Sequence, residues 1–225
     1  IRGGSATVHF PIWHQEIEDI LVLKNNKGTE DNRVRKLDYS IQISKLFYER
    51  LLADEEITLF SPHDVEDLYD VFGVDNEAFE ELYLKYEADR KTPKKKIKAM
   101  ELFSALLKER AETGRIYIMN IDHANTHSSF KDPVRMSNLC QEITLPTQPI
   151  QHIDDGEGEI ALCILSAINV GTLSKNLEEV EHLCDLSVRA LEQIIDYQQY
   201  PVKAAETSTK ARRSLGIGYI GLAHF

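Results

Sequence analysis

Ile116-Tyr117-Ile118-Met119-Asn120-Ile121 is a short apolar run rich in β-branched and aromatic residues, a composition that is typical of a buried strand. The segment before it, from Lys94 to Gly114, carries apolar residues at helical spacing and predicts a long helix that ends near the glycine. A helix that leads directly into a buried strand is the repeating unit of α/β folds with parallel strands. These two segments therefore predict an α/β fold.

The same patterns predict further elements along the rest of the chain. Expected strands lie at residues 57–60, 139–145 and 160–170, and Pro146 ends the second of them. Expected helices lie at residues 12–23, 38–53, 61–72, 76–90 and 177–197, a loop at 123–133, and a basic helix after Pro201 that leads into an apolar run at 215–222. Residues 12–113 are therefore interpreted as a mainly helical insertion, and residues 114–225 as the part that holds most of the strands.

Three motifs are explained by packing or solvation rather than by chemistry. The aromatic residues Phe79, Tyr83 and Tyr86 follow helical spacing, which favours a place in the core over a cofactor site. Cys184 falls on the apolar stripe of residues 177–197 and is expected to be packing. The lysine run at residues 94–96 is expected to be a solvated face.

Length and composition place the chain among soluble globular proteins. With 225 residues, 42% hydrophobic and 28% charged, the chain can bury a substantial core and is expected to be one large domain or part of one. The first residue is Ile1, and the chain stops at Phe225 after an apolar, glycine-rich run. We therefore expect a fragment of a longer protein.

Charge, hydropathy and cysteine content exclude several functional classes. The sequence has no run of eighteen apolar residues and no charged-then-apolar leader, so neither a membrane span nor a signal peptide is expected. Three cysteines are an odd and sparse set, which fits the reducing cytoplasm better than a secreted disulfide framework. The net charge of −11 disfavours DNA or RNA as a partner but permits small phosphorylated ligands.

Asn138-Leu139-Cys140-Gln141-Glu142 is the candidate reaction site. In an extended segment, side chains at alternate positions project from one face, so an amide, a thiol and a carboxylate would point together, roughly 6 to 7 Å apart. The alternative is that Cys140 is a small buried hydrophobe in a strand and the pattern is chance. A polar, histidine-rich segment at residues 122–129 precedes the site and a second cysteine, Cys163, follows it, which favours chemistry.

A nucleotide-binding module is the rival from another class. Gly216, Gly218 and Gly221 match G-x-G-x-x-G, the pattern that cradles a pyrophosphate. That fingerprint needs a preceding strand, a following helix and an acidic residue about 20 positions on. A basic helix precedes these glycines instead, so the context disfavours a dinucleotide site.

Histidines near the candidate site suggest two more alternatives. Asp122, His123 and His127 could supply metal ligands, although the surrounding residues favour a loop with histidines that hydrogen-bond near a polar pocket, and no metal site is expected. A nucleophilic enzyme that pairs Cys140 with one of these histidines is also conceivable. No sequence signature of acyl transfer accompanies that pair.

Several motifs, in order along the whole chain, resemble one family. The chain looks like the central part of the catalytic large (alpha) subunit of class I ribonucleoside-diphosphate reductase. The matching pieces are Arg2-Gly3-Gly4-Ser5-Ala6-Thr7, Leu23-Lys24-Asn25-Asn26, Leu59-Phe60-Ser61-Pro62-His63-Asp64, Thr113-Gly114-Arg115-Ile116-Tyr117, Ser137-Asn138-Leu139-Cys140 with Glu142, Glu159-Ile160-Ala161-Leu162-Cys163 and Arg212-Arg213-Ser214-Leu215-Gly216-Ile217-Gly218.

The resemblance implies part of a ten-stranded α/β barrel with a large helical insertion, which reduces ribonucleoside diphosphates by radical chemistry. Residues 138–142 would bind the substrate from a finger loop inside the barrel. Cys140 would become a thiyl radical that abstracts the ribose 3′ hydrogen, Glu142 would accept the 3′-hydroxyl proton, and Asn138 would hydrogen-bond the sugar hydroxyls. Leu139 and Gln141 complete the implied substrate contacts.

The resemblance also assigns roles to residues outside the finger loop. Cys163 matches one member of the reducing pair, whose partner would come from upstream of Ile1. Arg2, Gly3 and Gly4 resemble the loop that reports the effector nucleotide to the substrate base, and glycine permits the backbone rearrangement that such a loop requires. Gly216 and Gly218 would then provide close backbone approach within the barrel.

The implied cofactors and partners lie mostly outside the chain. They are ATP and deoxynucleotide effectors on the full subunit, a dinuclear metal–tyrosyl radical in a smaller radical-generating (beta) subunit, a second alpha subunit, and thioredoxin or glutaredoxin as reductant. The chain alone would bind no cofactor and would be inactive. The alternative function is a nucleotide-binding regulatory domain without chemistry.

Overall fold

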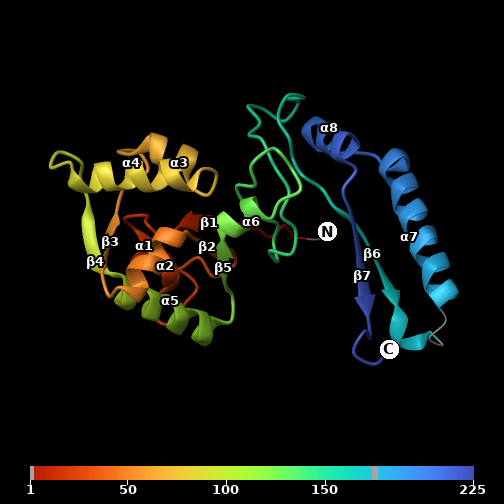
Figure 1. Ribbon diagram of the computed structural model, residues 1–225, viewed down its shortest axis with the longest axis horizontal. Coiled ribbons are helices and arrows are strands. Elements are labelled where there is room, and N and C mark those ends of the chain that lie inside the picture. Colours follow the sequence, from red (N-terminus) through yellow and green to blue (C-terminus); the bar gives the residue numbers. More distant parts are fainter. Residues whose placement is uncertain (1–2, 174–176) are drawn as a thin grey trace. The chain divides into compact units, whose positions relative to one another are not determined.

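The computed structural model describes residues 3–173 and 177–225, which form two compact units (Figure 1). The first unit runs to Leu145 and the second from Pro146 to Phe225.

A three-stranded parallel sheet forms the centre of the first unit. Its strands are β1 (Thr7–Pro11), β2 (Asp38–Ile43) and β5 (Ile116–Asn120), in the order β1-β2-β5 (Figure 1). The strand expected at residues 116–121 is confirmed, and so are parallel neighbours. The sequence did not predict β1.

The central strand corrects the helix expected at residues 38–53. Only α2 (Lys45–Leu52) is helical, and Asp38 begins a strand instead of capping a helix. Tyr39, Ile41 and Ile43 belong to the apolar core, whereas the alternate residues Ser40 and Gln42 are buried against polar partners. Both faces of this strand are covered, so most of its residues are buried. In the sequence, its apolar residues therefore look like a continuation of the apolar stripe of α2.

The two faces of this sheet differ in chemistry. One face presents apolar side chains to a core that includes residues of α1 (Ile17–Leu21), α2 and α5 (Ala99–Thr113). The other face carries polar side chains from β1 and β2, and the loop that holds the candidate site bonds to them. Alternation along each strand thus separates the core from the site.

Two further helices of the first unit, α3 (Glu66–Val71) and α4 (Asn76–Ala88), follow expected helices with shifted bounds. The helix α6 (Ile121–Thr126) and the 3-10 turn η1 (Glu30–Asn32) were not predicted. The helix expected at residues 12–23 shrinks to α1, and α6 occupies the start of the expected loop at 123–133. Phe79 and Tyr83 are buried in the core, as predicted.

The lysine run belongs to a strand rather than to the long helix. β4 (Lys95–Lys98) pairs antiparallel with β3 (Glu56–Leu59), and α5 starts only at Ala99. α5 ends as predicted, at Gly114, whose φ of 66° is the left-handed conformation that favours glycine.

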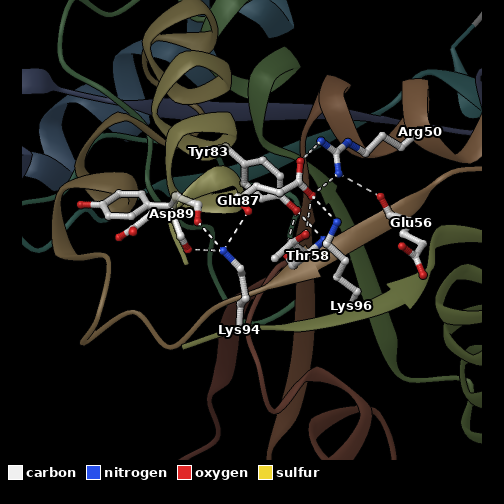
Figure 2. A network of polar contacts seen from close by, with 9 residues as sticks. Arg50, Glu56, Thr58, Tyr83, Glu87, Asp89, Lys94 and Lys96 are labelled. Atoms are coloured by element: carbon white, nitrogen blue, oxygen red, sulfur yellow. Dashed lines mark hydrogen bonds and ion pairs between the residues drawn. The ribbon is translucent and has the colours of Figure 1, made fainter. Parts of the chain in front are cut away.

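A largely buried ion pair connects this strand pair to the helices α2 and α4. Figure 2 shows Arg50, Thr58 and Lys96 converging on the carboxylate of Glu87. Arg50 of α2 donates two hydrogen bonds to Glu87 of α4, at 2.7 and 2.6 Å. The Arg50 guanidinium also lies 5.2 Å from the centre of the Tyr83 ring. The network thus connects four elements, α2, α4, β3 and β4, through one carboxylate.

The second unit is a smaller α/β arrangement. Its strands β6 (Ile164–Asn169) and β7 (Leu215–Ile220) are parallel, and between them the chain passes through the 3-10 turn η2 (Val170–Thr172), α7 (Leu177–Tyr197) and α8 (Lys203–Arg212) (Figure 1). The helix expected at residues 177–197 is confirmed at both ends, while the strand expected at 160–170 is shorter. Cys184 is half-buried on α7.

The fold class is therefore mixed α/β with parallel strands, as predicted. Among the described residues the parallel sheets have three and two strands, and they form no closed barrel. Residues 12–113 are rich in helix but also contain β2, β3 and β4, so the boundary of the proposed insertion stays a prediction. No helix within the described ranges combines the length and apolar character needed to cross a membrane.

Candidate functional site

The candidate site lies on a turn, which corrects the strand expected at residues 139–145. The backbone N–H of Gln141 donates to the carbonyl of Asn138 at 3.2 Å, and Gln141 has a φ of 62°. Side chains of residues 138, 140 and 142 therefore project from a tight turn and not from one face of an extended chain. These three side chains therefore do not share one face of a strand, and that prediction is wrong.

Polar side chains of β1 and β2 hold the loop that carries this turn. The Thr7 hydroxyl donates to the carbonyl of Leu139 at 2.5 Å, and the Gln42 amide donates to the carbonyl of Arg135 at 2.5 Å. The His9 Nε2 atom lies 3.2 Å from the carbonyl oxygen of Ser137. Burial lowers the pKa of His9, which favours its neutral form beneath the loop.

Asn138 stabilises the loop through hydrogen bonds to neighbouring loop residues. Its Oδ1 atom accepts hydrogen bonds from the backbone N–H of Ile143 at 3.0 Å and from the Ser137 hydroxyl at 3.3 Å. Within the described part of the chain, no protein group accepts from its Nδ2 atom. The exposed amide therefore keeps two donors for a ligand.

The thiol and the carboxylate of the turn both face solvent in this chain. Cys140 is an exposed free thiol, and Glu142 is exposed two residues later. Partial burial raises the pKa of Tyr117 on β5, and the nearby ionisable groups of Cys140 and Glu142 raise it further. A phenol is neutral at pH 7 even at its ordinary pKa of about 10, so Tyr117 is an uncharged neighbour of both groups.

Gln141 points the other way, toward the sheet. Its Oε1 atom accepts from the Ser40 hydroxyl at 2.5 Å, and its Nε2 atom donates to the carbonyl of Ile118 at 2.8 Å. The resemblance implied a substrate contact for this residue, whereas its side-chain amide binds β2 and β5.

In the second unit, Cys163 directly precedes β6 and lies against β7. A Cβ atom added to Gly216 would stand 3.2 Å from the Cys163 sulfur and 2.5 Å from the Cδ2 atom of Leu165. Gly216 thus permits the close backbone approach that the resemblance implied for both glycines, whereas Gly218 has ordinary space around it.

A bidentate ion pair between Glu159 and Arg212 holds the segment before Cys163. Glu159 accepts from Arg212 Nε at 2.7 Å and from Nη2 at 3.1 Å, and both side chains are largely buried. The adjacent Arg213 contacts Glu192 and Asp196 of α7. The two arginines fix the start of β7, and hence Gly216, relative to Cys163 and α7.

The glycine-rich match does not form a phosphate-binding loop. Gly216 and Gly218 lie inside strand β7, and Gly221 follows its end with a φ of 73°. A dinucleotide fingerprint needs these glycines in a turn that opens a helix.

The histidines do not assemble a metal site. His123 and His127 stack edge to face with ring centroids 5.5 Å apart, while Asp122 is buried and accepts the backbone N–H of Lys45 at 2.6 Å. Burial raises the pKa of Asp122. No three candidate ligands gather anywhere in residues 3–173 and 177–225.

The predicted effector loop lies at the edge of what the structure describes. Arg2 falls outside the described residues. Gly3 and Gly4 are exposed, and a Cβ atom at either would meet nothing within 4 Å. Packing within the described residues therefore does not require glycine at either position. The role of these residues in an effector loop stays a prediction.

Sequence reasoning missed Thr7, His9, Ser40 and Gln42, which hold the loop. No element was predicted for residues 7–11, and a helix was predicted where β2 lies, so these polar residues were not expected to share one face of a sheet. The available signal was strict alternation, with polar residues at 7, 9, 40 and 42 between apolar or aromatic neighbours.

The chain matches a known family over its full length. The model of the family described as ribonucleotide reductase, barrel domain, covers residues 1–225. The chain is 59% identical to the ribonucleoside-diphosphate reductase subunit alpha of Haemophilus influenzae over 228 aligned residues, which cover 100% of this chain and 30% of that protein.

More distant relatives show the same pattern. Identity is 57% to the ribonucleoside-diphosphate reductase 1 subunit alpha of Escherichia coli, with 100% of this chain and 30% of that protein covered. It is 35% to the large subunit from Danio rerio, with 99% of this chain and 27% of that protein covered. The chain thus spans less than a third of the length of these relatives.

Proposed function

Since the chain belongs to the ribonucleotide reductase family through its barrel domain, we propose that it carries the active-site segment of a class I large subunit that reduces ribonucleoside diphosphates to deoxyribonucleoside diphosphates. The observation that carries the proposal is the turn at residues 138–142. It presents an exposed thiol and an exposed carboxylate two residues apart, held over the polar face of a parallel sheet.

In the proposed reaction, Cys140 acts as a thiyl radical. It takes the hydrogen atom from C3′ of the ribose, so an S–H bond forms and the unpaired electron moves to C3′. Glu142 takes the proton of the 3′-hydroxyl, which requires the carboxylate within about 3 Å of that hydroxyl. The free Nδ2 donors of Asn138 hydrogen-bond the sugar hydroxyls.

The sugar then loses its 2′-hydroxyl as water. Two thiols supply the two electrons and two protons that this loss consumes, and they end as a disulfide. Cys163 is proposed as one of the two, and the second comes from another part of the subunit. The S–H hydrogen of Cys140 finally returns to C3′, which regenerates the thiyl radical, and Glu142 returns its proton to the 3′-oxygen.

The partners follow from the same proposal. A smaller beta subunit with a dinuclear metal and a tyrosyl radical generates the radical, and ATP or deoxynucleotides regulate the alpha dimer from effector sites. Thioredoxin or glutaredoxin re-reduces the disulfide. The chain alone is proposed to be inactive and the whole protein to act in the cytoplasm.

The test is Cys140→Ser in the full-length subunit, assayed for deoxynucleotide formation with its radical-generating partner. We expect no detectable product, because serine cannot replace the thiyl radical. Cys184→Ser is the matched control and is expected to keep activity, because Cys184 lies half-buried on α7. Product formation by Cys140→Ser would contradict the proposal and favour a regulatory nucleotide-binding domain without chemistry.

A further inference from the structure

Gln141 lies in the sequence between Cys140 and Glu142, the two proposed reacting groups, but its side chain hydrogen-bonds to the sheet. It receives a hydrogen bond from Ser40 on β2 and donates one to the carbonyl of Ile118 on β5. These bonds reach partners 101 and 23 positions away in the sequence. One side chain therefore connects the turn to two neighbouring strands.

The backbone of Gln141 also depends on this attachment. Its φ of 62° lies in the left-handed region, which residues with a Cβ atom rarely adopt. Such a conformation persists where surrounding contacts outweigh its cost. At Gln141, the two side-chain hydrogen bonds offset this cost. The hydrogen bond from the Thr7 hydroxyl to the carbonyl of Leu139 contributes as well.

The left-handed residue sets the directions of its two neighbours. Because Cys140 precedes Gln141 and Glu142 follows it, a change in the φ and ψ angles of residue 141 rotates one of these side chains relative to the other. A thiol and a base that act on the same ribose tolerate little displacement, since a shift of about 1 Å can cost about 100-fold in rate.

We propose that Gln141 is a positioning residue that locks the turn to β2 and β5 and so fixes Cys140 relative to Glu142. This inference rests on the proposed function. It replaces the substrate contact that the resemblance implied for Gln141 with a contact to Ser40 and Ile118.

The experiment compares single and double variants of the full-length subunit, assayed with the radical-generating partner. Gln141→Ala removes the anchor and keeps a Cβ atom at a left-handed position, whereas Gln141→Gly removes the anchor and also the steric cost of that conformation. Ser40→Ala removes one hydrogen bond from the opposite side. We expect kcat to fall about 10- to 100-fold in Gln141→Ala and about threefold to tenfold in Ser40→Ala.

Three further readouts separate positioning from other roles. The KM for the ribonucleoside diphosphate should stay within about twofold, and the double variant Ser40→Ala/Gln141→Ala should be no slower than Gln141→Ala alone. The alkylation rate of the Cys140 thiol, followed by mass spectrometry of its peptide, should change in the Gln141 variants. Gln148→Ala, at an exposed glutamine in the second unit, is the matched control and should change nothing.

Two outcomes would overturn the proposal. A raised KM with unchanged kcat in Gln141→Ala would make Gln141 a substrate contact. Independent, multiplying effects of Ser40→Ala and Gln141→Ala would mean that their hydrogen bond does not transmit the effect. Gln141→Gly guards against misfolding, because glycine accepts the left-handed conformation. If Cys140→Ser is inactive while either outcome occurs, the proposed function still holds. Only the positioning role of Gln141 is then contradicted.

Discussion

Gly216 approaches Cys163 so closely that a Cβ atom at residue 216 would lie 3.2 Å from the cysteine sulfur. That distance is tighter than most real Cβ contacts, so the sulfur would have to move. The glycine thus leaves the thiol room at the start of β6.

Gly216→Ala should therefore impair the proposed reducing step. In the full-length subunit we expect turnover to fall by about tenfold, because a thiol displaced by a fraction of an ångström meets its partner less often. Disulfide formation at Cys163 after a single turnover is the measurement. Gly218→Ala is the control, since its added methyl would meet only Ala167 at 3.8 Å and Ser166 at 3.9 Å. Equal losses in both variants would argue against a specific effect on the thiol.

The buried Arg50–Glu87 pair should contribute strongly to stability. Their side chains are 11% and 15% exposed, and Arg50→Met would leave the Glu87 carboxylate without its main partner. We expect the free energy of unfolding to fall by about 3–5 kcal/mol. Urea titration followed by the fluorescence of Trp13, the single tryptophan and a buried one, measures it.

An exposed pair provides the comparison for Arg50. Arg189 and Asp185 on α7 are 75% and 53% exposed, so Arg189→Met should cost only about 0.3–0.5 kcal/mol. Because Trp13 reports on the first unit, circular dichroism is needed for this variant. A loss in Arg50→Met as small as that in Arg189→Met would show that solvent already screens the buried pair.

Stability should fall as pH drops from 7 to 5.5, in part through His9. Burial lowers the pKa of His9 in the folded chain, whereas the unfolded chain binds a proton near pH 6.5. Protonation therefore favours unfolding, and stability is complete above about pH 6.5 and declines below it. His9→Gln should flatten this decline in urea titrations, although His14, whose pKa is also lowered by burial, should keep part of it. An unchanged slope in His9→Gln would count against this assignment.

Gly73 and Gly114 share a left-handed φ but differ in their surroundings. A Cβ atom at Gly73 would lie 2.3 Å from Cγ1 of Ile121, whereas one at Gly114 would meet nothing within 4 Å. Gly114→Ala should cost about 1–2 kcal/mol of unfolding free energy from backbone strain, and Gly73→Ala about 2–5 kcal/mol because overpacking adds to strain. Similar costs for both, measured by Trp13 fluorescence in urea, would show that Ile121 moves aside freely.

The strongest local patterns predicted their elements well. The stripe of residues 177–197 produced α7 with the expected bounds, and residues 116–121 produced β5, because each pattern has the length and period of one kind of element. β2 was not predicted, because its apolar residues continue into the apolar stripe of α2 and look helical in the sequence. Its strand conformation depends on pairing with β1 and β5.

The sequence by itself determined the α/β class, the family resemblance and the chemical identity of the candidate site, because residue types and their order are local properties. The tertiary structure alone decided that Asn138 to Glu142 form a turn and that Gln141 faces the sheet. Those features depend on hydrogen bonds to Thr7, Ser40 and Ile118, whose distance along the chain leaves no mark in the local pattern of residues 138–142.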